Sequence, residues 1–148
     1  MTALCLGILT GCGLPPRATT NPTQALAPDV ARDTPLGRAI TPLAAEHPGK
    51  SGIHALADAH DAFAARMMLA RTAQRSLDVQ YYIWHDDLTG TMLMEALHAA
   101  ADRGVRVRLL LDDNGTSGLD TVLAAMDAHP NIEVRLYNPF AVRWPKAI

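Results

Sequence analysis

Two pairs of adjacent aspartates stand at the ends of apolar runs, where they could do chemistry. Asp86 and Asp87 close the stretch SLDVQYYIWHDD, and Asp112 and Asp113 close VRVRLLLDD. Carboxylates that gather at the ends of parallel strands can hold magnesium for phosphoryl transfer, as they do in receiver domains. The first question is whether these side chains form a metal site or only end two strands.

The structural interpretation of these pairs is simpler, and we favour it. Asp87 or Thr89 can cap a helix that follows, because aspartate and threonine are good acceptors for free N–H groups at a helix start. Adjacent residues of an extended chain point to opposite sides, so at most one aspartate of each pair faces a common pocket. We keep Asp112 as a candidate pocket-wall residue, and we predict no metal site and no cofactor.

The histidines and cysteines are not spaced as metal ligands. No two of the six histidines stand four residues apart, the spacing that would align them on one helix face. The histidines are His47, His54, His60, His85, His98 and His129. Cys5 and Cys12 both lie near the start of the chain, where they cannot form a disulfide within a folded domain. We therefore expect solvated histidines or histidines at the edge of the core.

Composition and motif spacing exclude two classes of ligand. Gly49-Lys50-Ser51 has the ending of a phosphate-binding loop, but Ala44 stands where that loop needs another glycine, and no strand-like run precedes it. Nucleotide binding is therefore excluded. The net charge of -2 argues against a general nucleic-acid binder, which needs a basic surface, so we expect no nucleic-acid partner.

The first twelve residues resemble the end of a bacterial lipoprotein signal. An apolar stretch leads into Leu9-Thr10-Gly11-Cys12, which looks like a lipobox. Residues 1–12 are then a signal peptide and Cys12 is the lipid attachment site, which would anchor the chain to a membrane. We expect a periplasm-facing protein of the cell envelope. Gly13 after the cysteine slightly favours the outer membrane over the inner one. The alternative is a frayed apolar terminus.

Residues 13–47 are predicted to be a proline-rich tether. The segment from Gly13 to Pro48 holds seven of the ten prolines of the chain. Proline removes a backbone donor and biases the residue before it away from the helix. We therefore expect an extended connection there, followed by a folded domain over residues 48–148.

Apolar periodicity in the remaining chain predicts an α/β fold. Helical spacing over residues 55–75 is followed by a strand over 76–84, a helix over 89–103, a strand over 105–112, a helix over 119–129 and a strand over 132–138. Strands joined by single helices run parallel, and a parallel sheet is covered by helices on both faces. Three strands leave two open edges, which favour pairing with another chain or with a missing carboxy-terminal half.

Several parts of this pattern together resemble the phospholipase D superfamily, and in particular cardiolipin-synthase-like lipoproteins. The matching parts are Ser51-Gly52, Ser76-Leu77, Tyr81-Tyr82-Ile83, Asp87 with Gly90, AADRGVRVRLLLDD and NIEVRLYNPF. The resemblance covers residues 48–140. It implies a phospholipid substrate and the first, incomplete half of a phospholipase D-like domain, in which Ser51, Tyr82 and Asp112 could line a pocket.

In that family the working motif is His-x-Lys-x4-Asp, present twice. One imidazole attacks the phosphodiester, the second protonates the leaving alcohol, and the lysines stabilise the charge on the phosphoryl oxygens. None of the histidines of this chain is followed two residues later by lysine. The resemblance therefore assigns no catalytic residue, and we expect an amino-terminal fragment of a phosphatidyltransferase that is inactive alone.

Two alternatives remain open. The chain could be a membrane-anchored, non-catalytic α/β module that recruits a partner at its open sheet edge. A receiver-like phosphoacceptor would need magnesium at the aspartate pairs, and it lacks an equivalent aspartate after the third strand.

Overall fold

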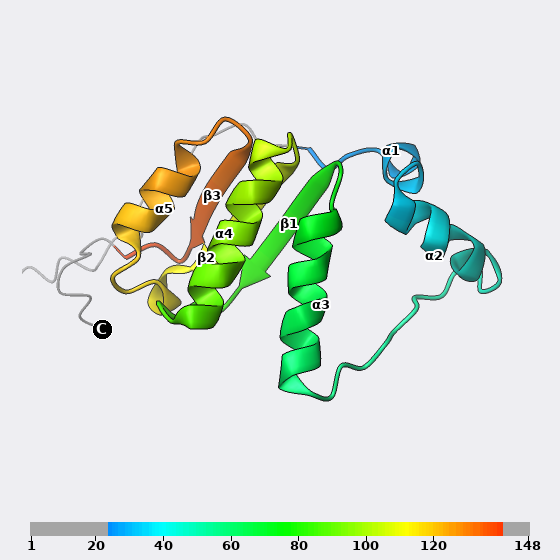
Figure 1. Ribbon diagram of the computed structural model, residues 1–148, viewed down its shortest axis with the longest axis horizontal. Helices are drawn as coiled ribbons and strands as arrows, with labels where there is room; N and C mark the ends of the chain where they lie inside the picture. Colours follow the sequence, from blue (N-terminus) through cyan, green and yellow to red (C-terminus); the bar gives the residue numbers. More distant parts are fainter. Residues whose placement is uncertain (1–23, 141–148) are drawn as a thin grey trace, which may run out of the picture.

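The computed structural model describes residues 24–140, so Cys12 and the lipobox lie outside the described residues. The elements are α1 (Pro28–Arg32), α2 (Pro35–Ala45), α3 (Ala59–Thr72), β1 (Ser76–Tyr81), α4 (Leu88–Asp102), β2 (Arg106–Asp112), a short 3-10 helix (Asp113–Gly115), α5 (Asp120–Asp127) and β3 (Ile132–Tyr137) (Figure 1). No helix within these residues combines the length and apolar character that a bilayer crossing requires.

The strands form one parallel sheet in the order β1-β2-β3, which confirms the predicted β-α-β-α-β order. Leu77 of β1 pairs with Val107 of β2, which pairs with Ile132 of β3. Both connections step in the same direction across the sheet. Since such crossovers are right-handed, their helices α4 and α5 belong on the same face, and Figure 1 shows them there, with α3 beside α4.

The core lies between these helices and the inward face of the sheet. Val107, Leu109 and Leu111 of β2 are almost fully buried and belong to one cluster with side chains from α3, α4 and α5. Each buried leucine contributes on the order of 1.5–3 kcal/mol. The apolar stripe predicted for residues 89–103 lies on α4 and is buried, as expected: Leu93, Ala96, Leu97 and Ala100.

The other face of the sheet is polar, and among the described residues no helix packs on it. The expectation of helices on both faces is therefore wrong for this part of the chain, because both crossovers step the same way. Arg108 of β2 lies opposite Asp78 of β1 and donates two hydrogen bonds to its carboxylate, from Nε to Oδ1 at 2.6 Å and from Nη2 to Oδ2 at 2.7 Å. The hydrogen bonds from Arg108 lower the pKa of Asp78, with a smaller opposing effect of partial burial.

The helix ends follow local capping rules. Asp58 accepts hydrogen bonds from the N–H groups of His60 and Asp61, so α3 begins four residues later than the predicted start at residue 55. Asp87 caps α4, as predicted. Gly104 takes a positive φ of 88° just after α4, which suits the residue that ends a helix.

The first strand is shorter than predicted. β1 ends at Tyr81, and Ile83 is 51% exposed rather than continuing the buried face. Trp84 is buried instead and meets the ring of Tyr81 edge-on, with centroids 4.9 Å apart. Gly90 allows this turn, because a Cβ there would lie 2.1 Å from the carbonyl oxygen of His85. The chain thus folds back onto the first turn of α4.

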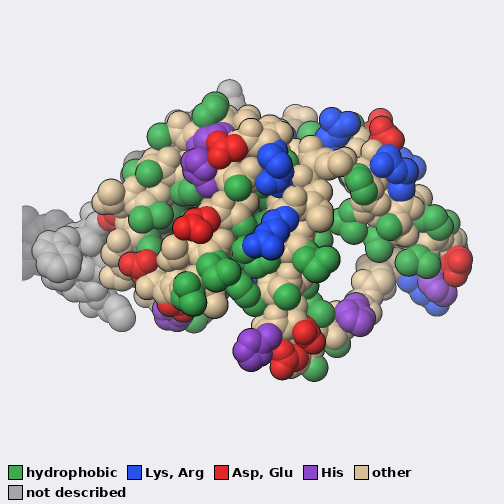
Figure 2. Space-filling model, viewed as in Figure 1, with side chains coloured by type: hydrophobic (Ala, Val, Ile, Leu, Met, Phe, Trp, Pro, Cys, Tyr) green, Lys and Arg blue, Asp and Glu red, His purple; other side chains and the backbone are tan. Residues whose placement is uncertain are grey.

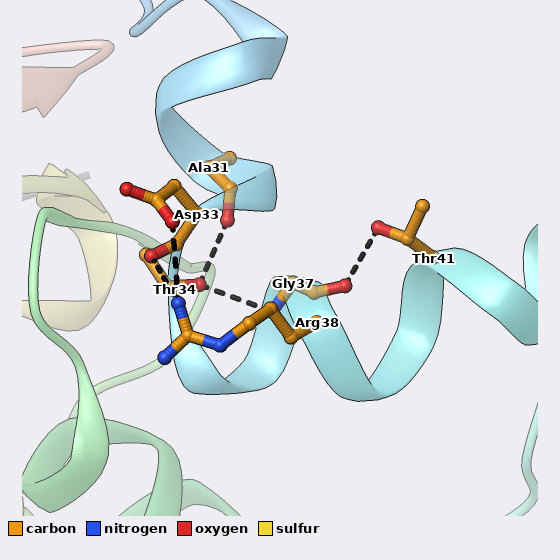
Figure 3. A network of polar contacts seen from close by, with 6 residues as sticks. All are labelled: Ala31, Asp33, Thr34, Gly37, Arg38 and Thr41. Atoms are coloured by element: carbon orange, nitrogen blue, oxygen red, sulfur yellow. Dashed lines mark hydrogen bonds and ion pairs between the residues drawn. The ribbon is translucent and has the colours of Figure 1, made fainter.

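Residues 28–32 and 35–45 are helical, so the expectation of extended chain throughout residues 13–47 is wrong. Pro35 occupies the first turn of α2, where a missing N–H costs nothing. Thr34 caps that helix: its Oγ1 accepts from the N–H of Gly37 at 3.0 Å and donates to the carbonyl of Ala31 at 2.7 Å (Figure 3). Pro28 and Pro35 therefore mark the starts of two helices.

Candidate functional site

The carboxyl ends of the three parallel strands meet at one edge of the sheet. Tyr81, Asp112 and Tyr137 are the last residues of β1, β2 and β3. Ligands of open α/β sheets bind outside this edge. The segments that follow the strands therefore decide what the edge can do.

Asp113 holds two of these segments together. Its side chain is fully buried, at 0% exposure. Oδ1 accepts a hydrogen bond from Oγ1 of Thr116 at 2.8 Å, and Oδ2 accepts one from the N–H of Phe140 at 2.7 Å. The carboxylate thus connects the turn after β2 to the segment after β3, and it positions the edge rather than facing a ligand.

Asp112, the predicted pocket-wall residue, has a local role instead. Its Oδ1 accepts from the N–H of Asn114 at 2.9 Å and so caps the short 3-10 helix. The sequence therefore singled out one member of the pair, and the structure buries the other. The reason is that Asp113 continues the alternation of β2: it follows the buried Leu109 and Leu111 at two-residue spacing, so its side chain points inward and that of Asp112 does not.

Tyr82 and Ser51, the other residues of the predicted pocket wall, both lie at the surface, and a pocket shared with Asp112 stays a prediction. The side chain of Tyr82 is 67% exposed. Only its backbone reaches the turn after β2, since a Cβ on Gly115 would lie 2.7 Å from its carbonyl oxygen. Ser51 is exposed in the connection from α2 to α3, which runs on the far side of α3 from β3 (Figure 1).

The other aspartate pair stays at the surface. Oδ1 of Asp87 accepts from the N–H of Gly90 and from Oγ1 of Thr89, both at 2.8 Å. These bonds, the one from Gly90 above all, lower the pKa of Asp87. Within residues 24–140, neither pair belongs to a group of ligand atoms close enough to share a metal ion. The structure gives no support to a receiver-like magnesium site.

A pocket of about 370 Å³ opens beside this edge, between α3 and α4 at the end of β1. Phe63, Trp84 and Leu93 supply apolar lining, and Arg66 and His85 add groups that can carry positive charge. Such a mixed lining suits an amphipathic ligand. The pocket offers binding groups, but no lysine lines it beside its histidine, so the lining does not hold the His-Lys pair of the family motif.

A second polar cluster, which the sequence analysis missed, lies at the opposite ends of the strands. Nδ1 of His98 is 3.3 Å from Oδ2 of Asp102, and Nε2 of His129 is 3.2 Å from Oδ1 of the same carboxylate. His98 and Asp102 stand four residues apart on α4, which is a readable signal. The sequence analysis compared only histidines with one another, and His129 reaches the cluster from the segment after α5.

Comparison with known proteins gives this fold a family context. A family model described as the phospholipase D-like domain of cardiolipin synthase matches residues 67–145. The chain is 59% identical to cardiolipin synthase C of Escherichia coli over 108 residues, which are 73% of this chain and 23% of that protein. It is 39% identical to an uncharacterized protein of Helicobacter pylori over 110 residues, 74% of this chain and 22% of that protein.

The chain thus spans about a quarter of the length of these curated relatives. Among solved structures, an archaeal chromatin protein, TrmBL2, resembles 76% of this chain and 44% of its own chain, with a TM-score of 0.47 and 19% identity. At that level the likeness carries no argument about function.

Proposed function

The chain belongs to the phospholipase D-like cardiolipin synthase family, and we propose that it is the amino-terminal portion of a phosphatidyltransferase that forms cardiolipin. The observation that carries the proposal is the family match over residues 67–145, which contain the whole parallel sheet. The identity of 59% to cardiolipin synthase C supports the same assignment. The proposed substrate is a phospholipid such as phosphatidylglycerol.

The chemistry that the resemblance implies needs groups that these 148 residues do not carry. Phosphatidyl transfer requires an imidazole to displace the leaving alcohol, a second imidazole to protonate it, and cations at the phosphoryl oxygens. The sequence has no His-x-Lys-x4-Asp motif. In our proposal a further segment, or another chain at an open sheet edge, supplies these groups, and this chain is inactive alone.

The part of this chain in the proposal is to build and hold one wall of the site. Asp113 connects the segments after β2 and β3, so the carboxyl edge keeps its shape. The pocket with Phe63 and Arg66 opens beside the same edge. An apolar lining with a cation at its rim fits a lipid that bears a phosphate group.

A chimera tests the proposal directly. The aligned residues of Escherichia coli cardiolipin synthase C are replaced by those of this chain, and cardiolipin formation from phosphatidylglycerol is measured in a strain that makes none. We expect the chimera to restore cardiolipin, and the same chimera carrying Asp113→Ala to restore far less. An exposed neighbour, Asp86→Ala, is the matched control and should leave the activity unchanged.

The isolated chain provides the complementary measurement. The purified 148-residue polypeptide, incubated with phosphatidylglycerol vesicles, should form no cardiolipin and no phosphatidic acid. Turnover by this polypeptide alone would contradict the proposal of inactivity. An inactive chimera whose protein is folded and abundant would contradict the proposed family role of these residues.

We further propose that Cys12 is lipid-modified and anchors the protein to the cell envelope, facing the periplasm, with the outer membrane slightly favoured. The support is the lipobox-like Leu9-Thr10-Gly11-Cys12. A lipid anchor would hold the domain at the surface that contains its proposed substrate. Metabolic labelling with a fatty-acid analogue should mark the wild-type chain and the Cys5→Ser variant and leave Cys12→Ser unlabelled. Labelling that survives Cys12→Ser would contradict the anchor.

The alternative function is a non-catalytic binding module. The observation that favours it is the polar sheet face, which no helix covers among residues 24–140 and which carries the paired charges of Asp78 and Arg108. A purified chain that is monodisperse and melts cooperatively would favour this alternative, and aggregation would favour the fragment.

A further inference from the structure

We propose that His98, Asp102 and His129 form a binding site for a divalent transition metal of the zinc class. The site is independent of the phosphatidyltransferase proposal, since it lies at the other end of the strands. One ligand atom from each residue can be chosen so that all three lie within 4.8 Å of one another. Within residues 24–140 this is the one group of possible metal ligands with that geometry.

The ligand set suits a zinc-type ion. Zinc sites with two imidazoles, one carboxylate and an open position for water are common in proteins, with metal–ligand distances of about 2.0–2.2 Å. Ligand atoms at that radius around a tetrahedral centre lie about 3.4 Å apart. Each imidazole lies near this spacing from one oxygen of Asp102, His98 at 3.3 Å from Oδ2 and His129 at 3.2 Å from Oδ1. With one ligand atom from each residue, all three atoms lie within 4.8 Å of one another.

The backbone holds the three residues in place before any ion arrives. His98 and Asp102 are one helical turn apart on α4, so they share a face. His129 follows α5, and its neighbour Asn131 fixes this segment by donating from Nδ2 to the carbonyl of Ala101 at 3.0 Å. The rings of His98 and His129 meet edge-on with centroids 5.1 Å apart. Binding therefore requires only small side-chain rotations.

The site is open to solvent on one side. The side chains of His98 and Asp102 are 47% and 59% exposed, whereas that of His129 is 15% exposed and forms the inner wall. Figure 2 shows histidine and acidic side chains gathered on the surface over one end of α4. An ion can reach the site without opening the core, and a water molecule can fill its remaining coordination position.

The ring nitrogen of His129 that carries the proton limits the affinity of the site for a metal ion. Its Nδ1 accepts a hydrogen bond from the N–H of Asn131 at 3.1 Å, so the neutral ring carries its proton on Nε2 and donates it to Asp102. A metal at Nε2 requires the other tautomer, with the proton on Nδ1, and the bond from Asn131 must then break. Losing one neutral hydrogen bond weakens binding by about tenfold. His98 can bind through Nδ1 without such a change, and we expect a micromolar rather than a nanomolar site.

Metal binding there would join α4 to the segment that leads into β3. An ion that binds only the folded chain stabilises it by mass action. Imidazole ligands favour zinc, nickel and copper over magnesium. The site would thus act on stability, at a distance from the carboxyl edge and its lipid chemistry.

The test uses the untagged 148-residue chain, from which a chelator has first removed any bound metal. Zinc chloride is then titrated into it, and calorimetry measures the binding. We expect one equivalent of zinc to bind with saturation, magnesium not to bind, and cobalt to give the absorption of a tetrahedral complex. His98→Ala and Asp102→Asn should each weaken zinc binding by at least about tenfold, because each removes one of three ligands.

The matched control is His60→Ala. His60 lies 3.4 Å from Asp58, which gives it a carboxylate partner much like that of His98 but no third ligand. We expect this variant to bind zinc as the wild type does. In nuclear magnetic resonance spectra, the ring signals of His98 and His129 should shift to saturation while those of His60 do not.

Three outcomes would overturn the proposal. They are the absence of saturable zinc binding, unchanged binding in both His98→Ala and Asp102→Asn, and non-saturating shifts shared by His60. A failed cardiolipin chimera would leave these measurements untouched, so the two proposals fail separately.

Discussion

Two adjacent aspartates lie near the end of β1 and near the end of β2: Asp86-Asp87 just before α4, and Asp112-Asp113 where β2 ends. Only the second pair has a buried member. Asp113 is fully buried and accepts from Thr116 and from the segment after β3. Asp87 is exposed and accepts only from the first turn of α4. Both carboxylates accept hydrogen bonds, but their surroundings differ.

The two pairs differ in which segment of the chain supplies the hydrogen-bond donors to the aspartate. After β2 the second aspartate continues the buried side of the strand, and the segment after β3 donates a hydrogen bond to it. After β1 residues 82–87 lead into α4, and Asp87 is the N-cap residue, whose exposed carboxylate accepts from the free N–H groups of the first turn. Burial therefore decides which carboxylate the fold depends on.

The largest predicted effect is at Asp113. Asp113→Ala leaves the N–H of Phe140 without its acceptor and removes a partner of Thr116 inside the protein. We expect the free energy of unfolding to fall by about 3 kcal/mol, because unsatisfied buried polar groups are costly. Urea denaturation followed by circular dichroism measures the loss.

Asp113→Asn separates charge from hydrogen bonding at the same position. The amide keeps one oxygen for Thr116 but presents an NH2 group to the N–H of Phe140, so two donors meet. This variant should also be destabilised. If it is as stable as the wild type, then the bond to Phe140 does not hold the edge as we describe.

The main elements of the fold could be predicted because alternation is a strong signal. Val107, Leu109 and Leu111 alternate with polar residues, and they are the buried side of the central strand. The parallel order followed from the helix between each pair of strands. The helix α2 was missed because proline was interpreted only as a helix breaker, although Pro35 after Thr34 is also a start signal.

The site was harder to predict because its contacts join distant parts of the chain. Asp113 continues the alternation of the buried residues of β2, so its inward direction could be predicted, but its acceptor role depends on Phe140, far along the chain. Two of the three residues in the cluster at His98 could be paired from the sequence, because His98 and Asp102 stand four residues apart on one helix. Its third member could come only from the packing of α5 beside α4.

The second prediction concerns Asp112, which lies at the same turn but is only partly buried. Asp112→Ala removes the cap of the short 3-10 helix, the bond from the N–H of Asn114. We expect a loss of about 1 kcal/mol, typical of a lost cap. The same urea measurement on Asp112→Asn should recover most of it, since asparagine caps well. A loss as large as that of Asp113→Ala would contradict the division of roles within the pair.

The third prediction is a dependence on pH at Asp87. Its pKa is lowered in the folded state from an ordinary value of 3.8, chiefly by the N–H of Gly90. A lowered folded pKa stabilises the protein above the unfolded pKa, and this contribution is lost as the pH falls through the folded value. Asp87→Ala should therefore be less stable than the wild type at pH 7, by less than the Asp112→Ala variant. The two urea midpoints should converge towards pH 3.

A constant gap between these midpoints from pH 7 to pH 3 would mean that the ionised carboxylate has no special role. Asp87→Asn is the control for charge. Its amide oxygen still accepts from the helix N–H groups, so the variant keeps the cap and loses the titration. It should differ little from the wild type at pH 3.

The smallest effect is expected at Asp86, the exposed partner of Asp87. Its side chain borders an open pocket between α4 and α5, and replacing it by alanine removes no buried group. Asp86→Ala should change the free energy of unfolding by no more than about 0.5 kcal/mol, as surface substitutions usually do. The measurement is the urea midpoint at pH 7, beside that of Asp113→Ala. A loss at Asp86 near that of Asp113→Ala would mean that sequence position in the pair, rather than burial, determines the energy, and the comparison of the two turns would fail.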